Sequence, residues 1–183
     1  MFELTDPSGR GREAHIEKKL TRSKAQTVEQ LKKEIDHHVT ERPIIVFTEK
    51  GESDYDAMLK ATAVDEQGVS WHVVSDKKKA NEVRNIMSLR PRGVIRVCRE
   101  YARGYDLKLT QDAHVIIVAN GHEMKLTEVM QMIGRGCRSQ GKPKGTVIIE
   151  SDLYNDSSEA WDAISTRRTD ANANCAENLG KLA

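Results

Sequence analysis

The sequence is poor in the features that mark several large classes of protein. Only 4% of the residues are aromatic, which is too few for a surface on which successive nucleobases stack. No apolar run approaches the roughly 18 residues of a membrane-spanning helix, and the first seven residues have neither the basic head nor the apolar stretch of a signal peptide. We therefore expect no membrane partner. The net charge of +1 does not by itself indicate any other partner.

Cysteine is also scarce, and histidine is scattered. Cys98, Cys137 and Cys175 are widely spaced and odd in number, so they are not a disulfide framework, and no Cys-x-x-Cys pair indicates zinc. A reducing compartment, the cytoplasm or the nucleus, fits this usage best. His37 and His38 fall in a charged helical stretch, where we expect a solvated face and not a pair of metal ligands.

Changes of composition divide the chain into three parts. Residues 1–23 are expected to form a flexible basic arm or interdomain linker, because the turn-rich stretch 7–12 has nothing to bury. Residues 24–150 carry the periodic apolar patterns of one domain. Residues 151–183 are expected to form a C-terminal helix, anchored by Trp161 and Ile164, and a frayed tail.

The central part alternates between helical and strand patterns. Residues 24–39 predict a helix, since its apolar residues recur at three- and four-residue spacing, and shorter helical patterns occupy 53–62, 76–87 and 126–133. Strands that are apolar throughout are buried on both faces, which indicates a parallel sheet covered by helices. We therefore predict a doubly wound α/β fold with a mainly parallel sheet of about five strands and helices on both faces. The expected strands are 44–48, 69–74, 94–98, 115–118 and 146–149.

The most informative stretch for function is 131–138, with the sequence Gln-Met-Ile-Gly-Arg-Gly-Cys-Arg. Arg135 and Arg138 lie three residues apart, so both guanidinium groups can converge on one anion. Gly134 and Gly136 permit close approach of the backbone. The alternative is two surface arginines on a helix end that glycine weakens. The stretch resembles motif VI, Gln-x-x-Gly-Arg-x-x-Arg, of superfamily 2 helicases.

Two upstream stretches resemble other motifs of the same family, in the family's order. The expected strand 94–98 leads into Ala-Arg-Gly-Tyr-Asp, which is similar to motif V, with Gly104 and Asp106 at its glycine and aspartate. The end of strand 44–48 is similar to motif IV. The resemblance covers about residues 24–150 and implies the second RecA-like domain of a helicase or translocase.

The sequence departs from the family pattern at two places. Many relatives have Val-Ala-Thr-Asp where this chain has Val-Cys-Arg-Glu at 97–100, and the segment is one residue shorter. The threonine contact to a backbone phosphate that the family makes is therefore not expected in the same form, and Arg99 is the residue that could supply positive charge in its place. Motif VI begins with Gln131 where DEAD-box proteins have histidine. That difference argues against the DEAD-box group and for Dicer-like, DEAH-like or Swi/Snf-like relatives.

The resemblance also implies roles for individual residues. In the intact protein, ATP with Mg²⁺ would bind between this domain and a first RecA-like domain, and RNA or DNA would cross the strand ends. Arg138 is then the arginine finger and Arg135 assists it. The residues expected at the nucleotide are Gln131, Gly134, Asp106 and Gly104. The residues expected at the nucleic acid are Phe47, Thr48, Ser75, Lys77, Arg99 and Arg103.

The parts that the first domain supplies are not recognisable in this chain. Residues 136–143 nearly spell a phosphate-binding loop, but Pro143 removes the hydroxyl that would hold magnesium, and the loop follows a helix where a strand is needed. Asp65-Glu66 resembles the acidic box of the first domain, but no apolar strand precedes it. The chain alone is therefore expected to bind no ATP and to hydrolyse none.

Local charge favours nucleic acid as a partner. Residues 76–104 hold nine basic and three acidic side chains, an excess of six on a chain whose net charge is +1. The alternative function is a non-catalytic RecA-like module for nucleic-acid binding or protein interaction. An unrelated doubly wound enzyme would need a glycine-rich nucleotide loop after the first strand, and residues 49–52 are not one.

Overall fold

The computed structural model describes residues 2–5, 11–49, 71–74, 93–99, 112–120, 124–137 and 144–167. Within these ranges, seven strands form one sheet in the order β1-β2-β7-β6-β3-β5-β4. The strands are β1 (Phe2–Thr5), β2 (Gly11–Thr21), β3 (Ile44–Thr48), β4 (Trp71–Val74), β5 (Val94–Cys98), β6 (His114–Asn120) and β7 (Lys144–Glu150). All neighbouring pairs are parallel except β1 with β2. The prediction of a mainly parallel sheet is confirmed, and the five apolar strands expected from the sequence are β3 to β7.

The sequence predicts an arm or linker for the first 23 residues, but Gly11–Thr21 form strand β2 of the sheet. Strand β2 pairs in parallel with β7, from His15 opposite Lys144 to Thr21 opposite Glu150. The pattern of apolar runs did not predict this strand, because the strand is not such a run. Ile16 is buried, whereas residues 17–19 are Glu-Lys-Lys and remain at least partly exposed. Its backbone is paired by β7, and main-chain hydrogen bonds need no particular side chain.

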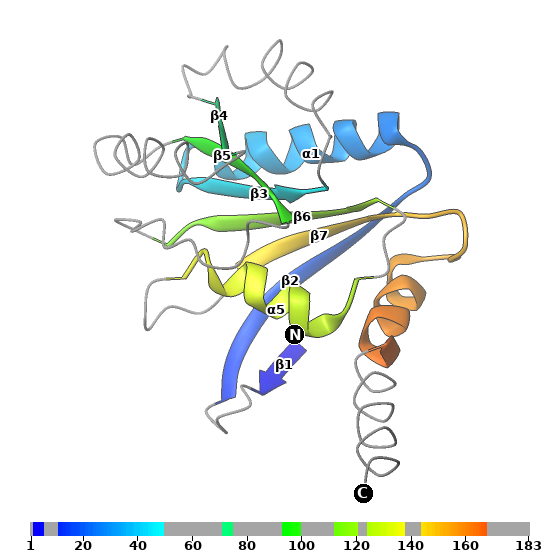
Figure 1. The fold of residues 1–183 in the computed structure, drawn as a ribbon. Helices are drawn as coiled ribbons and strands as arrows, with labels where there is room; N and C mark the ends of the chain where they lie inside the picture. The colour runs from blue at the N-terminus through cyan, green and yellow to red at the C-terminus, as the bar shows by residue number, and fades with distance from the viewer. Residues whose placement is uncertain are drawn as a thin grey trace, which may run out of the picture.

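Helix α1 (Lys24–His38) covers one face of the sheet (Figure 1). It begins where predicted, since the Ser23 hydroxyl accepts a hydrogen bond from the Gln26 amide at 3.2 Å and caps the helix. The buried face is also the predicted one, and its residues join a hydrophobic cluster with residues of β3, β5, β6 and β7. The residues that α1 and its C-cap contribute to this cluster are Val28, Leu31, Ile35 and Val39.

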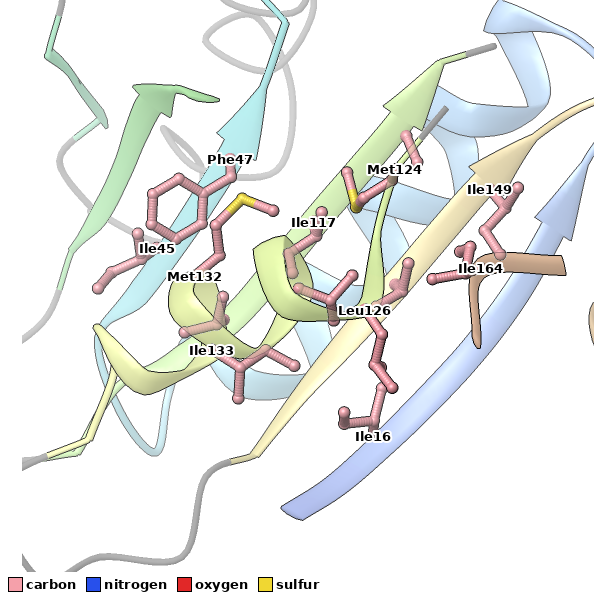
Figure 2. Packing of buried hydrophobic residues seen from close by; sticks show 14 of the residues in the cluster. Ile16, Ile45, Phe47, Ile117, Met124, Leu126, Met132, Ile133, Ile149 and Ile164 are labelled. Atoms are coloured by element: carbon pink, nitrogen blue, oxygen red, sulfur yellow. The ribbon is translucent and has the colours of Figure 1, made fainter. Parts of the chain in front are cut away.

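Helix α5 (Leu126–Gly134) and a helix at 157–167 cover the other face (Figure 1). Figure 2 shows Met132 and Ile133 of α5 over Ile45, Phe47 and Ile117 of the sheet. Both expected anchors of the C-terminal helix are buried: Trp161 is 1% exposed and Ile164 is 3% exposed. The amino group of Lys18 on β2 lies 5.1 Å from the centre of the Trp161 ring, so this helix also contacts the added strand.

Three sequence expectations lie outside the described residues. These are the helices at 53–62 and 76–87 and the tail after 167. In the part of the chain that the structure describes, no helix is both long and apolar enough to cross a membrane.

Candidate functional site

Helix α5 runs from the carboxyl ends of the strands toward their amino ends. Its first turn lies at the carboxyl ends of the strands, where Glu128 is 3.7 Å from Arg99, the residue after β5. Its last turn leads to Gly136, which contacts Ala113 just before β6. The described residues of motif VI therefore lie toward the amino ends of the strands. The described residues expected at the nucleic acid, Phe47, Thr48 and Arg99, lie at the carboxyl ends.

Residues 131–134 of the motif VI stretch end α5, and residues 135–137 form the turn after it. The backbone amides of Arg135, Gly136 and Cys137 donate to the carbonyls of Met132, Ile133 and Gly134 at 3.1–3.2 Å, which tightens the helix end. The turn is fastened to the sheet, because the Ala113 amide donates to the Gly136 carbonyl at 2.8 Å.

The two glycines of this stretch differ in what surrounds them. A Cβ atom on Gly136 would overlap Val115 Cγ2 and lie 3.0 Å from the Ala113 carbonyl oxygen, so the prediction of close approach is confirmed there. A Cβ atom on Gly134 would meet nothing within 4 Å. The fold therefore requires glycine at 136 and leaves open space at 134.

Gln131 and Arg135 lie one helical turn apart at this end of α5. Gln131 is exposed and Arg135 is half-buried, and their four-residue spacing places them on the same side of the helix. Gly134, also exposed, lies between them. The structure thus brings together three of the six residues expected at the nucleotide or in catalysis. The other three, Arg138, Gly104 and Asp106, lie outside the described residues.

At the carboxyl ends of the strands, Arg99 binds carboxylates of its own domain. Its Nη1 atom lies 2.7 Å from Glu49 Oε1, and its Nη2 atom lies 3.7 Å from Glu128 Oε2. The Arg99 side chain is only 14% exposed. It therefore ties the residue after β3, the residue after β5 and the first turn of α5 together, and it does not present a free positive charge to a nucleic acid as the sequence had indicated.

Two further residues expected at the nucleic acid are buried within the domain. Phe47 is 2% exposed and packs in the core under α5, and Thr48 is 0% exposed. The Thr48 hydroxyl accepts a hydrogen bond from Arg96 Nη1 at 2.8 Å. The reason is the position of β3, which lies between β6 and β5 and is covered on both faces. Ser75, Lys77 and Arg103 lie outside the described residues.

The basic excess at 76–104 is also smaller at the surface than the sequence implies. Of its nine basic residues, only Arg96 and Arg99 fall within the described ranges. Arg96 is 5% exposed, and Arg99 is paired with Glu49. These two contribute little to an open positive patch.

A polar cluster that the sequence did not predict lies near the amino ends of the strands, on the face of the sheet that α1 covers. The His38 and His114 rings stack with their centres 3.7 Å apart, and Glu34 Oε2 lies 3.6 Å from His38 Nε2 and 4.0 Å from His114 Nε2. The Thr146 hydroxyl donates to Glu34 Oε2 at 3.0 Å. His38 is thus half-buried, so the solvated face expected for the two adjacent histidines applies only to the exposed His37.

Burial controls the protonation of this pair of histidines. Loss of solvation lowers the pKa of His114 to about 3, and the neighbouring His38 and Arg42 add to that shift. Loss of solvation also lowers the pKa of His38, although the Glu34 carboxylate opposes the change. Glu34 and His38 stand four residues apart in α1, which was the available sequence signal, but nothing in the sequence shows that β6 brings His114 to them.

Comparison with known proteins gives a likeness in structure alone. No protein-family model matches the chain, and no curated protein matches its sequence. The C-terminal domain of the DEAD-box protein Dbp5 superposes with a TM-score of 0.56 at 13% identity, over 77% of this chain and 78% of that one. The E. coli DEAD-box protein SrmB, solved bound to the regulator RraA, gives 0.55 at 19% identity, over 76% and 79%. The chain has a RecA-like fold.

A third match agrees with this fold and bears on one expectation. Domain 2 of the DEAD-box helicase Mss116p, solved on an RNA duplex, gives a TM-score of 0.56 at 18% identity over 75% of this chain; the match spans 55% of that chain. All three neighbours are DEAD-box proteins, so the exclusion of that group on Gln131 is not supported. A single side chain at the end of α5 does not affect the sheet and core on which structural likeness depends.

Proposed function

We propose that this chain is the second motor domain of an ATP-dependent nucleic-acid helicase or translocase. The observation that supports this most is the end of α5. Gln131 and Arg135 share one side of a helix end that Gly136 fastens to β6, in a fold similar to domain 2 of DEAD-box proteins. The motif VI spacing and the RecA-like fold are independent of each other, and they agree on the same domain.

The role proposed for this end of α5 is electrostatic. A first RecA-like domain would hold ATP and Mg²⁺, and this chain would present positive charge across the cleft to the transferring phosphoryl group. Arg138 would be the arginine finger and Arg135 its assistant, while Gln131, Gly134, Gly104 and Asp106 would lie near the nucleotide. Stabilising the charge that develops in the transition state in this way can raise the rate ~10³-fold or more.

The nucleic-acid partner is proposed from the likeness in fold. Mss116p domain 2 was solved with RNA, and a related fold in this chain makes RNA or DNA a reasonable partner. Because Phe47, Thr48 and Arg99 are buried or ion-paired, the remaining candidate contacts are Ser75, Lys77 and Arg103. Contacts to phosphate from such residues are independent of base sequence and sensitive to salt.

Arg138→Lys in the natural full-length protein tests the proposal. Lysine keeps the charge but loses the planar fork that holds two phosphate oxygens, so ATP turnover should fall by most of its value. Nucleic-acid affinity and the melting temperature should remain nearly unchanged, because a finger reaches out of its own domain. Normal turnover in this variant would refute the assignment of Arg138.

A non-catalytic module is the second candidate, and one observation favours it. Three of the six side chains expected at the nucleic acid are engaged within the domain itself. In this case the wild-type full-length protein would bind its partner but show no nucleic-acid-stimulated release of phosphate. That single measurement separates the two candidates.

A further inference from the structure

We propose that Glu34, His38 and His114 bind one divalent transition-metal ion of the zinc class. Each residue offers one ligand atom, and these three atoms all lie within 4.8 Å of one another. Two histidines and one glutamate are a donor set that zinc accepts, with a fourth position for water. The site does not depend on the motor function proposed above, since it lies on the α1 face of the sheet, away from α5.

The distances are close to those of a coordinated ion. Tetrahedral zinc with bonds of about 2.0–2.2 Å separates neighbouring ligand atoms by about 3.4 Å. Glu34 Oε2 lies 3.6 Å from His38 Nε2 and 4.0 Å from His114 Nε2. Compared with about 3.4 Å, these two distances are longer by about 0.2 and 0.6 Å. The ligand atoms of the two histidines, which lie within 4.8 Å of each other, must also approach for an ion to bind.

The charge of the cluster favours a cation. Glu34 is a buried residue, and among the described residues the groups that hydrogen-bond to its carboxyl group are uncharged: Gln30 Nε2 donates to Oε1 at 3.2 Å, and the Thr146 hydroxyl donates to Oε2 at 3.0 Å. A buried negative charge is costly unless it is compensated, and a divalent ion would compensate it. Gln30 would also orient the ligating carboxylate, as outer-shell partners commonly do.

Zinc binding would replace the hydrogen bond between His114 and Thr146. The Thr146 hydroxyl has one proton and gives it to Glu34, so His114 Nε2, which lies 3.1 Å from that oxygen, must be the donor to it. To ligate through Nε2, His114 gives up this hydrogen bond and carries its proton on Nδ1 instead. Thr146 keeps its bond to Glu34 and remains an outer-shell partner.

His38 is the ligand that would move. The two rings lie 18° from parallel, with centres 3.7 Å apart, so a single ion cannot lie in both ring planes as the rings stand. The His38 side chain is 19% exposed, against 7% for His114, and it follows the last buried residue of α1 at the helix end. It therefore has room to turn, and the same opening gives an ion and its water access from solvent.

The ion would connect the end of α1 to the start of β6. It would stabilise the domain by binding the folded state and not the unfolded one, which raises the melting temperature with metal concentration. Because Arg135 lies on the opposite face, the effect should appear in stability and need not appear in ATP turnover.

The test uses the purified chain, stripped with a chelator and titrated with Zn²⁺. We expect one bound zinc ion per chain by equilibrium dialysis and a zinc-dependent rise in melting temperature, while Mg²⁺, which prefers oxygen ligands, should give neither. His38→Ala should weaken zinc binding at least tenfold. His37→Ala is the matched control, because it removes an exposed imidazole next to the site, and it should bind zinc as the wild type does.

Cobalt(II) provides a second measurement that does not depend on stability. Its visible absorption should indicate tetrahedral nitrogen and oxygen coordination in the wild type and in His37→Ala, and the signal should be lost in His38→Ala. No stoichiometric zinc binding by the wild type would overturn the proposal. So would equal binding by His38→Ala and the wild type, or equal losses in the two histidine variants, since either result would indicate weak surface binding only.

Discussion

Gly136→Ala should destabilise the domain, and Gly134→Ala should stabilise it. The new methyl group at 136 would overlap Val115 Cγ2 and press on the Ala113 carbonyl oxygen at 3.0 Å. That oxygen belongs to the backbone beside β6, which cannot yield without disturbing the Ala113–Gly136 hydrogen bond. Overpacking of this kind costs about 1–3 kcal/mol. For a chain of this size, the melting temperature should fall by roughly 2–12 °C.

The control substitution lies two residues away, in the last position of α5. A methyl group at 134 would meet no atom within 4 Å, and Gly134 is helical, so alanine should gain about 0.5–1 kcal/mol from reduced backbone freedom in the unfolded chain. Thermal and urea unfolding of the two variants beside the wild type measure both changes. If the two substitutions shift stability in the same direction, Gly136 does not pack closely against Val115 and Ala113.

Two further predictions concern residues that hold the domain together. Arg99→Ala should lower stability by about 1.5 kcal/mol, because Arg99 hydrogen-bonds to the Glu49 carboxylate, and it should leave nucleic-acid affinity by fluorescence anisotropy unchanged; weaker binding with normal unfolding would show that Arg99 instead reaches the nucleic acid. Trp161→Ala should cost about 3–5 kcal/mol in urea unfolding, because the ring is buried; a loss below 1 kcal/mol would show that helix 157–167 is dispensable.

Local patterns were sufficient for much of the fold. The apolar spacing of α1 is a property of neighbouring residues, and the structure has this helix and its buried face as predicted. The apolar runs of β3 and β5 likewise predicted these strands, because a strand that is buried on both faces does not alternate between apolar and polar residues. Strand β2 lacks such a run, and only its pairing with β7 reveals it.

Some features of the candidate site could likewise be predicted from local spacing, and others could not. The motif VI spacing could be read along one helix, where Gln131 and Arg135 share a side because of the 3.6-residue repeat. The contacts of Arg99 with Glu49 and Glu128 could not, because they join segments that are 50 and 29 positions apart. The burial of Phe47 and Thr48 likewise depends on which strands flank β3.

By itself, the sequence determined the positions of α1, α5 and the apolar strands and the spacing of the motif VI residues, because these depend on nearby residues. Only the tertiary structure decided which charges are free and which polar groups meet. Glu34 and His38 are one helical turn apart in the sequence, but His114 and Thr146 join them only through the pairing of β6 with β7 and the packing of α1 on that sheet. Strand order places these groups, and strand order is a property of the whole chain.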